Sequence, residues 1–316
     1  MAIANFADRL LAAIDQRQTP LILGLDPVYE KLPPALTSQP GMNDSGRAGD
    51  CVNAMFEFCR QIIAVAAMHV PAVKINSAYF ERYQWRGWQV YGRLVQEARD
   101  AGLLVIGDVK RADIGHTAEQ YAAATLADSN FGDLGHTAGP DAITINPYFG
   151  GDGIKPFTDL AQKTGKGVFI LLRTSNPSAG EIQEIPAADG QPLYQHVADH
   201  IASWGQGLMG SSGFSAVGAV VGATTRDSLI QLRRALPHTL FLIPGIGAQG
   251  GNLQDCAHVF DRAGHGAVIS ASRSIIFAYR DQKYAGFSGQ HWSQAVLQAL
   301  LDTRNEIAAA LPATRR

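Results

Sequence analysis

Two acids and one lysine lie close together in the stretch GDVKRADIGHT, which covers positions 107–117. Asp108 and Lys110 follow an apolar run, 103–106, that predicts a buried strand, and Asp113 comes three residues later in a predicted turn. Because side chains two apart in a strand point the same way, we expect the Asp108 carboxylate and the Lys110 ammonium to project together. Such a group can stabilise developing charge or donate a proton. The alternative is a solvated turn with a surface ion pair, which contributes little.

The composition excludes several classes of protein. The chain has 316 residues, of which 46% are hydrophobic, so it can bury a large core. Its formal charge of −2 does not indicate a basic surface for nucleic acid or membrane, and any anion site must be local. The three scattered cysteines indicate a reducing compartment without a disulfide framework. They are Cys51, Cys59 and Cys256.

The first 18 residues predict an amphipathic helix rather than a signal peptide. No segment approaches the roughly 18 uninterrupted apolar residues of a membrane span. We therefore expect a soluble, cytoplasmic protein with neither a nucleic-acid nor a membrane partner.

Eight apolar segments alternate with helical ones along the chain. The predicted strands are 20–26, 70–76, 103–106, 142–147, 167–172, 216–221, 240–243 and 267–271. The predicted helices are 51–68, 77–101, 117–126, a segment from 151, 193–204, 226–236, 253–263 and 292–311. Alternating strands and helices favour a parallel sheet, and eight such units predict a closed (β/α)₈ barrel.

We expect one TIM-barrel domain over residues 1–316, with an N-terminal helix and loop insertions. An open doubly wound sheet is the alternative. It is disfavoured because the glycine-rich turn PGIGAQGG follows the seventh strand rather than the first, and no ribose-binding acid follows it at the usual spacing.

Functional groups of such a barrel come from the carboxyl ends of its strands and from the loops that follow them. The polar residues at these positions are Asp26, Lys74, Asn76, Asp108, Lys110, Asp113, Ser175, Gln249 and Arg273. Each alone could be an ordinary loop residue. Together they predict several acids and two lysines at one mouth.

The last two strands predict a phosphate site. Gly245, Gly247, Gly250 and Gly251 leave backbone N–H groups open to an anion, and Arg273 could bind a phosphate with its guanidinium. Barrels of this kind often bind phosphate at these two loops. The alternative is a tight glycine turn beside a surface arginine.

The two lysines have acidic neighbours, which favour the ammonium form. We therefore expect Lys74 and Lys110 to stabilise charge or donate protons rather than form a Schiff base. Their positive charge also disfavours a metal ion in the same site. His196 and His200 are four residues apart on a predicted helix but lack the H-E-x-x-H pattern of a zinc site.

The pattern D-x-K-x-x-D-I-x-x-T resembles the signature of the orotidine 5′-phosphate decarboxylase family. Its residues here are Asp108, Lys110, Asp113, Ile114 and Thr117. Asp26, Lys74, the PGIGAQGG loop and Arg273 match the family in order, so the resemblance covers essentially the whole chain. The longer loops near 28–50, 128–140 and 177–192 resemble the longer bacterial branch.

The resemblance implies a cofactor-free and metal-free carboxy-lyase that converts orotidine 5′-phosphate to uridine 5′-phosphate (UMP), the last step of de novo pyrimidine synthesis. It implies that Lys110 protonates C6 of the pyrimidine as carbon dioxide leaves, and that Asp108 lies beside the departing carboxylate. Lys74 would complete an alternating array of charges and, like Asp26, contact the ribose.

The resemblance also implies a homodimer, with Asp113 and Thr117 reaching into the partner's site. Ser175 would hydrogen-bond the pyrimidine, and Gln249 and Arg273 would hold the phosphate. The further substrate-binding residues expected are Asn76, Ile114 and Gly247. Ser272 departs from the family, which commonly has glycine directly before the arginine.

Three other functions share parts of this pattern. A sugar-phosphate decarboxylase or hexulose-phosphate synthase has the same barrel and D-x-K-x-x-D, but places a magnesium-binding acid where this chain has Lys74. A non-catalytic nucleotide-phosphate binding protein would not need the carboxylates. A Schiff-base aldolase would use Lys74 or Lys110 as a nucleophile.

Overall fold

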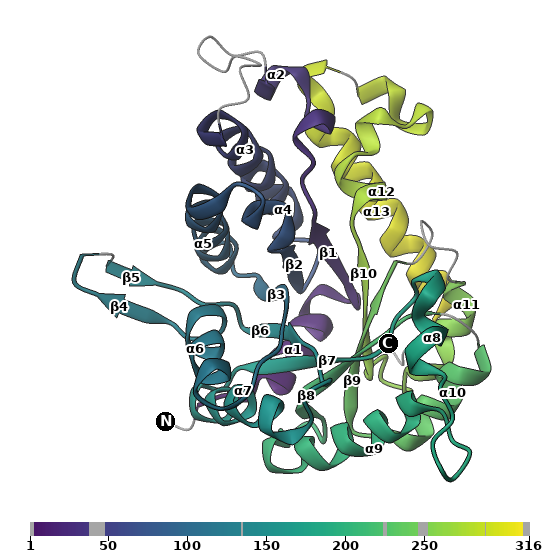
Figure 1. Ribbon diagram of the computed structural model, residues 1–316. Coiled ribbons are helices and arrows are strands. Elements are labelled where there is room, and N and C mark those ends of the chain that lie inside the picture. The colour runs from purple at the N-terminus through teal and green to yellow at the C-terminus, as the bar shows by residue number, and fades with distance from the viewer. Residues whose placement is uncertain are drawn as a thin grey trace.

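The computed structural model describes residues 3–37, 48–133, 135–223, 226–245, 252–287 and 289–311. Within these ranges, eight parallel strands close into a barrel in the order β1-β10-β9-β8-β7-β6-β3-β2 (Figure 1). The strands are β1 (Leu21–Leu25), β2 (Ala72–Asn76), β3 (Leu104–Arg111), β6 (Ala142–Ile145), β7 (Gly167–Arg173), β8 (Ser215–Val221), β9 (Thr239–Pro244) and β10 (Ala267–Ala271). The predicted (β/α)₈ barrel is confirmed.

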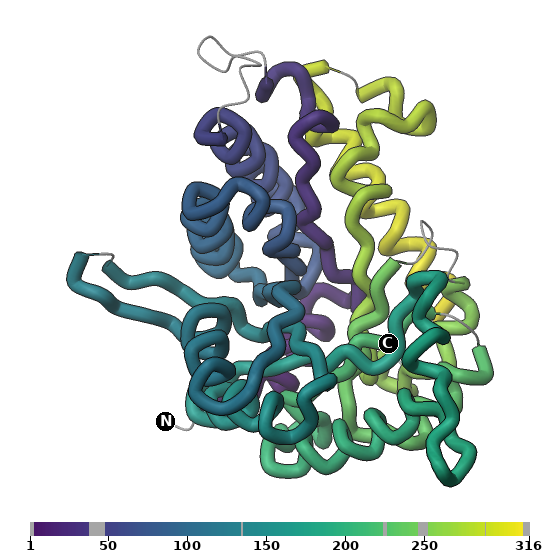
Figure 2. Tube along the Cα trace, viewed as in Figure 1, coloured from purple at the N-terminus to yellow at the C-terminus, as the bar shows by residue number. Residues whose placement is uncertain are grey.

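Helices surround this barrel, and the long ones other than α1 (Phe6–Arg17) cover its outside (Figure 2). The longer helices are α1 (Phe6–Arg17), α3 (Ala48–Ala66), α5 (Gln84–Asp100), α6 (Gly115–Thr125), α7 (Gly151–Thr164), α9 (Leu193–Gly205), α10 (Arg226–Ala235) and α13 (Trp292–Ala310). The short ones are α2 (Pro34–Thr37), α4 (Ala78–Glu81), α8 (Gly180–Gln183), α11 (Leu253–Cys256) and α12 (Arg273–Ile276). Nearly continuous apolar strands are the expected result, because a parallel barrel buries both faces of its sheet.

Helix α1 packs against the amino-terminal end of the barrel strands. The Phe6 ring meets the Phe169 ring edge to face, with centroids 5.9 Å apart. Arg9 Nη1 lies 2.6 Å from Oδ1 of the buried Asp141, which directly precedes β6. The helix begins at a polar cap, because the Asn5 side chain accepts a hydrogen bond from the Ala7 N–H. This arrangement leaves the opposite, carboxyl-terminal end of the strands open for a site.

All three predicted loops contain regular structure, and the 177–192 loop holds a 3₁₀ turn, Pro177–Ala179, followed by α8. The 28–50 segment holds a 3₁₀ turn, Tyr29–Lys31, and α2 before α3 begins at Ala48. The 128–140 segment holds an antiparallel hairpin, β4 (Ser129–Phe131) and β5 (Gly135–Thr137), which stands out from the barrel in Figure 1. Short polar strands of this kind contain no apolar run, so the pattern that predicts the barrel strands does not predict them.

The predicted helix over 253–263 is wrong for most of its length. Helix α11 ends at Cys256, and a 3₁₀ turn, Ala257–Val259, follows it. The Asp261 carboxylate then accepts hydrogen bonds from the N–H groups of Ala263 and His265. Aspartate side chains compete in this way with helical hydrogen bonds and favour turns, so no helix forms over 261–263.

Candidate active site

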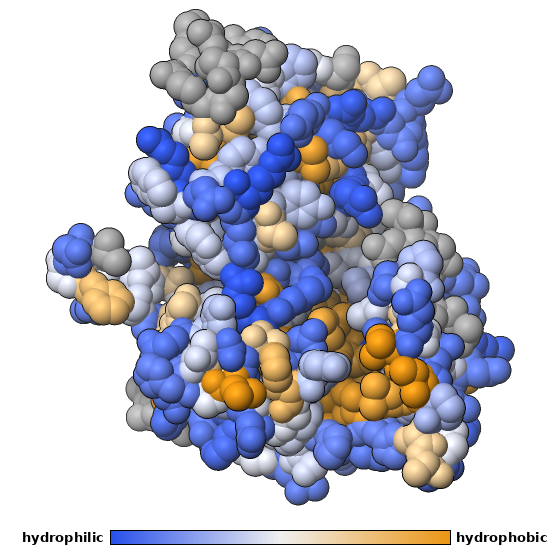
Figure 3. All heavy atoms as spheres, viewed as in Figure 1, coloured by the Kyte–Doolittle hydropathy of each residue, from blue (hydrophilic) through white to orange (hydrophobic). Residues whose placement is uncertain are grey.

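A cavity of about 730 Å³ opens at the carboxyl-terminal ends of the barrel strands. This volume is in the range of small-molecule sites. In the space-filling view the face is hollowed near its centre, where hydrophilic and hydrophobic residues meet (Figure 3). The polar residues that line it are Asp26, Lys74, Asn76, Tyr79, Asp108, Lys110, Thr144, Thr174, Ser175, Asn176, Ser270, Ser272, Arg273 and Ser274.

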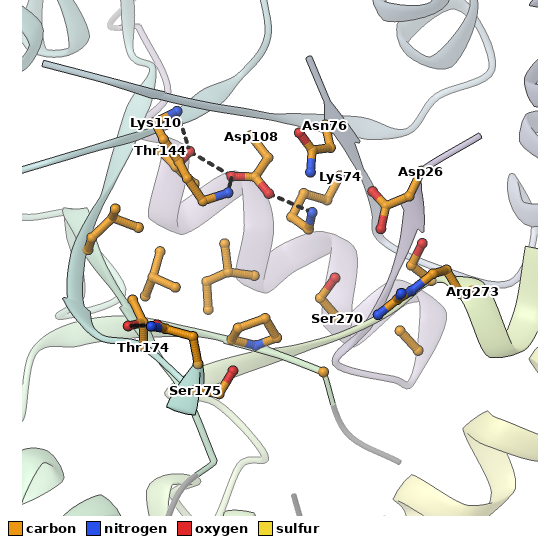
Figure 4. A pocket seen from close by; sticks show the side chains of 18 of the residues that line it. Asp26, Lys74, Asn76, Asp108, Lys110, Thr144, Thr174, Ser175, Ser270 and Arg273 are labelled. Atoms are coloured by element: carbon orange, nitrogen blue, oxygen red, sulfur yellow. Dashed lines mark hydrogen bonds and ion pairs between the residues drawn. The ribbon is translucent and has the colours of Figure 1, made fainter. Parts of the chain in front are cut away.

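Lys74, Asp108 and Lys110 form a charge array on one side of this cavity (Figure 4). Lys74 Nζ lies 2.9 Å from Asp108 Oδ2, and Lys110 Nζ lies 2.5 Å from Asp108 Oδ1. Asp108 and Lys74 are buried, whereas half of the Lys110 side chain is exposed to the cavity. The Asp108 carboxylate therefore lies between two ammonium groups. Of the two lysines, only Lys110 exposes much of its side chain to a ligand in the cavity.

Both buried members of the charge array are held in their charged forms. Burial alone would raise the pKa of the Asp108 carboxyl, but Lys74 and Lys110 hold that pKa well below its usual range. Burial opposes the ammonium form of Lys74, but Asp108 and Asp26 raise the pKa of Lys74 above its usual value. A buried Lys74 in the ammonium form is a poor nucleophile, so the geometry disfavours a Schiff base at this position.

The backbone of β3 is irregular where it carries the charge array. Gly107 pairs with Ile143 and Arg111 pairs with Ile145, so four steps along β3 match two steps along β6. Lys110 within this bulge has φ of 45°, in the left-handed region. The expected proximity of Asp108 and Lys110 is therefore present, but a bulge produces it rather than the alternation of a regular strand.

Asp26 lies further along the cavity, at the end of β1, and Figure 4 shows its carboxylate and the Arg273 side chain in the same region. Asp26 Oδ1 is buried without a hydrogen-bond partner in the described part of the chain. Burial and the neighbouring Asp26 raise the pKa of the Tyr79 hydroxyl. An unpaired buried acceptor is costly, so this oxygen marks a place for a donor group of a ligand.

Ser272 fits its position although the related family commonly has glycine there. Its φ of −133° lies outside the left-handed region that favours glycine. The side chain fills space that Gly24 leaves, because a Cβ atom on Gly24 would lie 2.7 Å from Ser272 Cβ. Ser272 Oγ is buried and lacks a hydrogen-bond partner among the described residues.

Most of the residues predicted at the barrel mouth line this one cavity. They are Asp26, Lys74, Asn76, Asp108, Lys110, Ser175 and Arg273. Asp113, Ile114 and Thr117 are not among the described residues of the lining. Asp113 Oδ1 accepts a hydrogen bond from the Ile114 N–H, and the Ile114 side chain is 53% exposed. Gly247 and Gln249 lie outside the described residues.

Sequence reasoning did not place seven polar residues of the lining in the site: Tyr79, Thr144, Thr174, Asn176, Ser270, Ser272 and Ser274. Thr144 carried a detectable signal, because it is a polar residue in the middle of an apolar strand. Its hydroxyl donates to Asp108 Oδ1 at 2.9 Å and accepts from the Lys110 N–H at 3.0 Å. Tyr79 lies in the predicted helix over 77–101, where no motif marks it as a site residue.

The predicted histidine pair serves other contacts. His196 Nε2 lies 3.2 Å from Asp189 Oδ1, and the His200 ring stacks on Trp204. In the described ranges, no group of three or more His, Cys, Asp or Glu side chains is arranged to hold a metal ion. Across the same ranges, no helix combines the length and apolar character needed to span a bilayer.

The sequence is similar to known proteins of one family. Residues 19–286 match the model of the orotidine 5′-phosphate decarboxylase / HUMPS family. The orotidine 5′-phosphate decarboxylase of Rhodopirellula baltica is 37% identical over 305 residues, which are 96% of this chain and 99% of that protein. That of Caldicellulosiruptor bescii is 37% identical over 284 residues, covering 90% and 93% of the two chains.

A solved structure of Leishmania donovani OMP decarboxylase superposes with a TM-score of 0.71 at 27% identity, covering 97% of this chain and 98% of the other. The family resemblance predicted from the motifs is thereby confirmed. The chain belongs to the orotidine 5′-phosphate decarboxylase / HUMPS family.

Proposed function

We propose that this protein is the carboxy-lyase that converts orotidine 5′-phosphate to UMP and carbon dioxide in pyrimidine biosynthesis. The observation that carries the proposal is the charge array, which presents the Lys110 ammonium to a cavity large enough for a nucleotide. The relatives with this printed activity match nearly the full length of the chain. We expect the enzyme in the cytoplasm, where its charged nucleotide substrate and product are held.

The charge array suits the chemistry of this reaction. When the bond between C6 and the carboxylate breaks, its electron pair stays on C6 as an in-ring carbanion that no adjacent π system delocalises. The Lys110 ammonium stabilises this charge without solvent reorganisation, then transfers a proton to C6 and becomes a neutral amine. Solvent returns the proton to the lysine. Asp108 holds Lys110 in place and lies near the departing carboxylate.

The remaining lining residues would orient the substrate. Asp26, with its unpaired buried oxygen, and Lys74 would bind the ribose, and Asn76 lies beside them at the end of β2. Ser175 would hydrogen-bond the amide edge of the pyrimidine from the opposite side of the cavity (Figure 4). Arg273 would hold the phosphate with Gly247 and Gln249. Binding of the remote phosphate would contribute energy to organising the reacting centre.

Loss of absorbance from orotidine 5′-phosphate on addition of the purified protein tests this function. We expect turnover at an unchanged rate after treatment with a chelator, because Lys74 occupies the position of a magnesium-binding acid in the sugar-phosphate members of the superfamily. As the control, the chelator-treated protein is exchanged into buffer that contains magnesium, and its rate is measured again. A folded protein that leaves the absorbance unchanged would contradict the proposed reaction, and a rate that chelation abolishes and magnesium restores would contradict the metal-free mechanism.

We further propose that the active form is a homodimer in which Asp113, Ile114 and Thr117 contribute to the partner's site. Large apolar side chains are exposed beside these residues, at Tyr148 (80%) and Phe149 (50%). Gly153 packs against both Phe149 and the Asp113 backbone, so the two segments form one surface. An exposed apolar surface of this kind commonly marks a protein interface.

Mixing two inactive variants tests the shared site. In a hybrid of Lys110→Ala and Asp113→Ala subunits, one of the two sites keeps both residues. Random exchange makes about half of the dimers hybrid, so we expect about a quarter of the wild-type activity. Each variant incubated alone is the control, and mass spectrometry of differently labelled subunits verifies exchange. If exchange is complete and the mixture stays inactive, Asp113 does not serve the partner's site.

A further inference from the structure

We infer that Thr144 is a positioning residue, which aims the Lys110 ammonium by fixing the backbone bulge that carries it. The inference rests on the proposed function, in which Lys110 is the proton donor. It adds that the orientation of Lys110 depends on the Thr144 hydroxyl. Thr144 is 1% exposed, on β6, and it lies at the edge of the cavity. Nothing in the family motif includes this position.

The bulge in β3 lies directly opposite Thr144. The ladder between β3 and β6 is regular up to the pair Gly107–Ile143 and resumes at the pair Arg111–Ile145. Thr144 is the one residue of β6 between these two pairs, and it faces the extra residues of β3. In such a bulge, a backbone N–H of the longer strand loses its ladder partner. Here that group is the N–H of Lys110, and Thr144 Oγ1 accepts its hydrogen bond at 3.0 Å.

The same hydroxyl also orients the acid of the charge array. Its single proton is donated to Asp108 Oδ1 at 2.9 Å, the oxygen that also accepts from Lys110 Nζ. The Thr144 hydroxyl is therefore hydrogen-bonded directly to the backbone of Lys110. Through Asp108 it is also linked to the Lys110 side chain. A hydroxyl has one donor and two acceptor positions, so both bonds form at once.

This bond matters because Lys110 has an unusual backbone conformation. Non-glycine residues rarely adopt a φ of 45°, and they keep it only where the surroundings enforce it. Loss of the Thr144 hydroxyl leaves the Lys110 N–H unpaired and removes one of the three side-chain hydrogen bonds that hold Asp108. The strand can then relax toward a regular pairing, which moves Nζ away from the reacting carbon.

Replacement of Thr144 by valine removes the hydroxyl and keeps the shape of the side chain. We expect Thr144→Val to lower kcat about 100-fold, the loss typical of a misplacement of about 1 Å, with KM changed less than about threefold. Thr144→Ser keeps the hydroxyl and should retain most of the wild-type kcat. Thr158→Val is the matched control, because Thr158 is also buried but its hydroxyl bonds the Lys155 carbonyl of α7, outside the cavity.

Crystal structures of the variants test the geometry independently of turnover. In Thr144→Val, Lys110 should leave the left-handed region and its Nζ should separate from Asp108, whereas Thr144→Ser should keep both. If the valine protein does not fold, Thr144→Ala takes its place in both measurements. An unchanged Lys110 backbone in the variant without a hydroxyl, or a serine variant as slow as the valine one, would overturn the inference. Absence of turnover in the wild-type protein would instead contradict the proposed function alone.

Discussion

The Lys110→Ala enzyme is expected to lose at least about 10⁴-fold in kcat while still binding orotidine 5′-phosphate. Two contributions disappear together, because Lys110 would both stabilise the carbanion at C6 and supply its proton. Contacts to the ribose and phosphate come from other strands, so binding should persist. The Lys110 side chain is half exposed to the cavity. Its removal should therefore destabilise the fold only slightly.

Single-turnover kinetics with excess enzyme would measure the chemical step, and calorimetry with UMP would measure binding. Lys155→Ala is a suitable control, since Lys155 is an exposed lysine of α7 that also pairs with an aspartate, Asp159. A Lys110→Ala rate within about tenfold of the wild type would exclude both roles assigned to this residue. Borohydride treatment in the presence of a carbonyl substrate should trap nothing on Lys74 or Lys110.

The Asp108→Asn protein is expected to lose about 3–5 kcal/mol of unfolding free energy at neutral pH, besides most of its activity. Removal of the carboxylate leaves the buried Lys74 ammonium without its closest counter-ion and facing Lys110. Removal of one member of a buried ion pair lowers the free energy of unfolding far more than removal of one member of an exposed pair. Urea denaturation monitored by fluorescence would give the difference.

The pH dependence of this loss follows from the lowered pKa of Asp108. The folded-state pKa lies below the unfolded value of about 3.9, so the stabilisation is complete above that value and declines as the pH falls below it. The difference between the two proteins should therefore be constant from about pH 5 to 8 and shrink under acid. Asp159→Asn, which breaks an exposed pair, should cost no more than about 0.5 kcal/mol.

A second substitution separates charge from shape. Lys74→Met in the Asp108→Asn background should recover part of the lost stability, because no uncompensated charge then remains buried at that position. If the double variant is as unstable as the sum of the two single variants, the loss in Asp108→Asn arises from packing or hydrogen bonds instead of charge.

The barrel and the location of its site were predictable from the sequence, because both depend on local patterns. Apolar strands alternating with helices specify the parallel sheet, and the carboxyl ends of parallel strands must meet at one edge. Lys74 and Asp108 could therefore be placed together although they are 34 residues apart. The relation between Asp113 and the neighbouring subunit stays a prediction, since one chain cannot display a shared site.

The local geometry of the charge array was not predictable in the same way. The bulge at Lys110 depends on how β3 pairs with β6, and no pattern within the motif specifies that register. The role of Thr144 was not predictable for the same reason, since it arises only from the strand that Thr144 faces. The helix predicted over 253–263 failed because Asp261 forms a local turn, which the apolar spacing does not reveal.

The packing of α1 under the barrel has a consequence for synthesis of the chain. Its Arg9 pairs with a residue 132 positions later, and its Asp8 accepts hydrogen bonds from Ser211 and Ser212, more than 200 positions later. The Arg17 carbonyl of the same helix accepts a hydrogen bond from Arg304, so the first helix to leave the ribosome gains all of its partners only when nearly the whole chain has been made. Until the barrel strands have been made, its apolar face has no native place to pack, so α1 must dock late and is exposed to aggregation during translation.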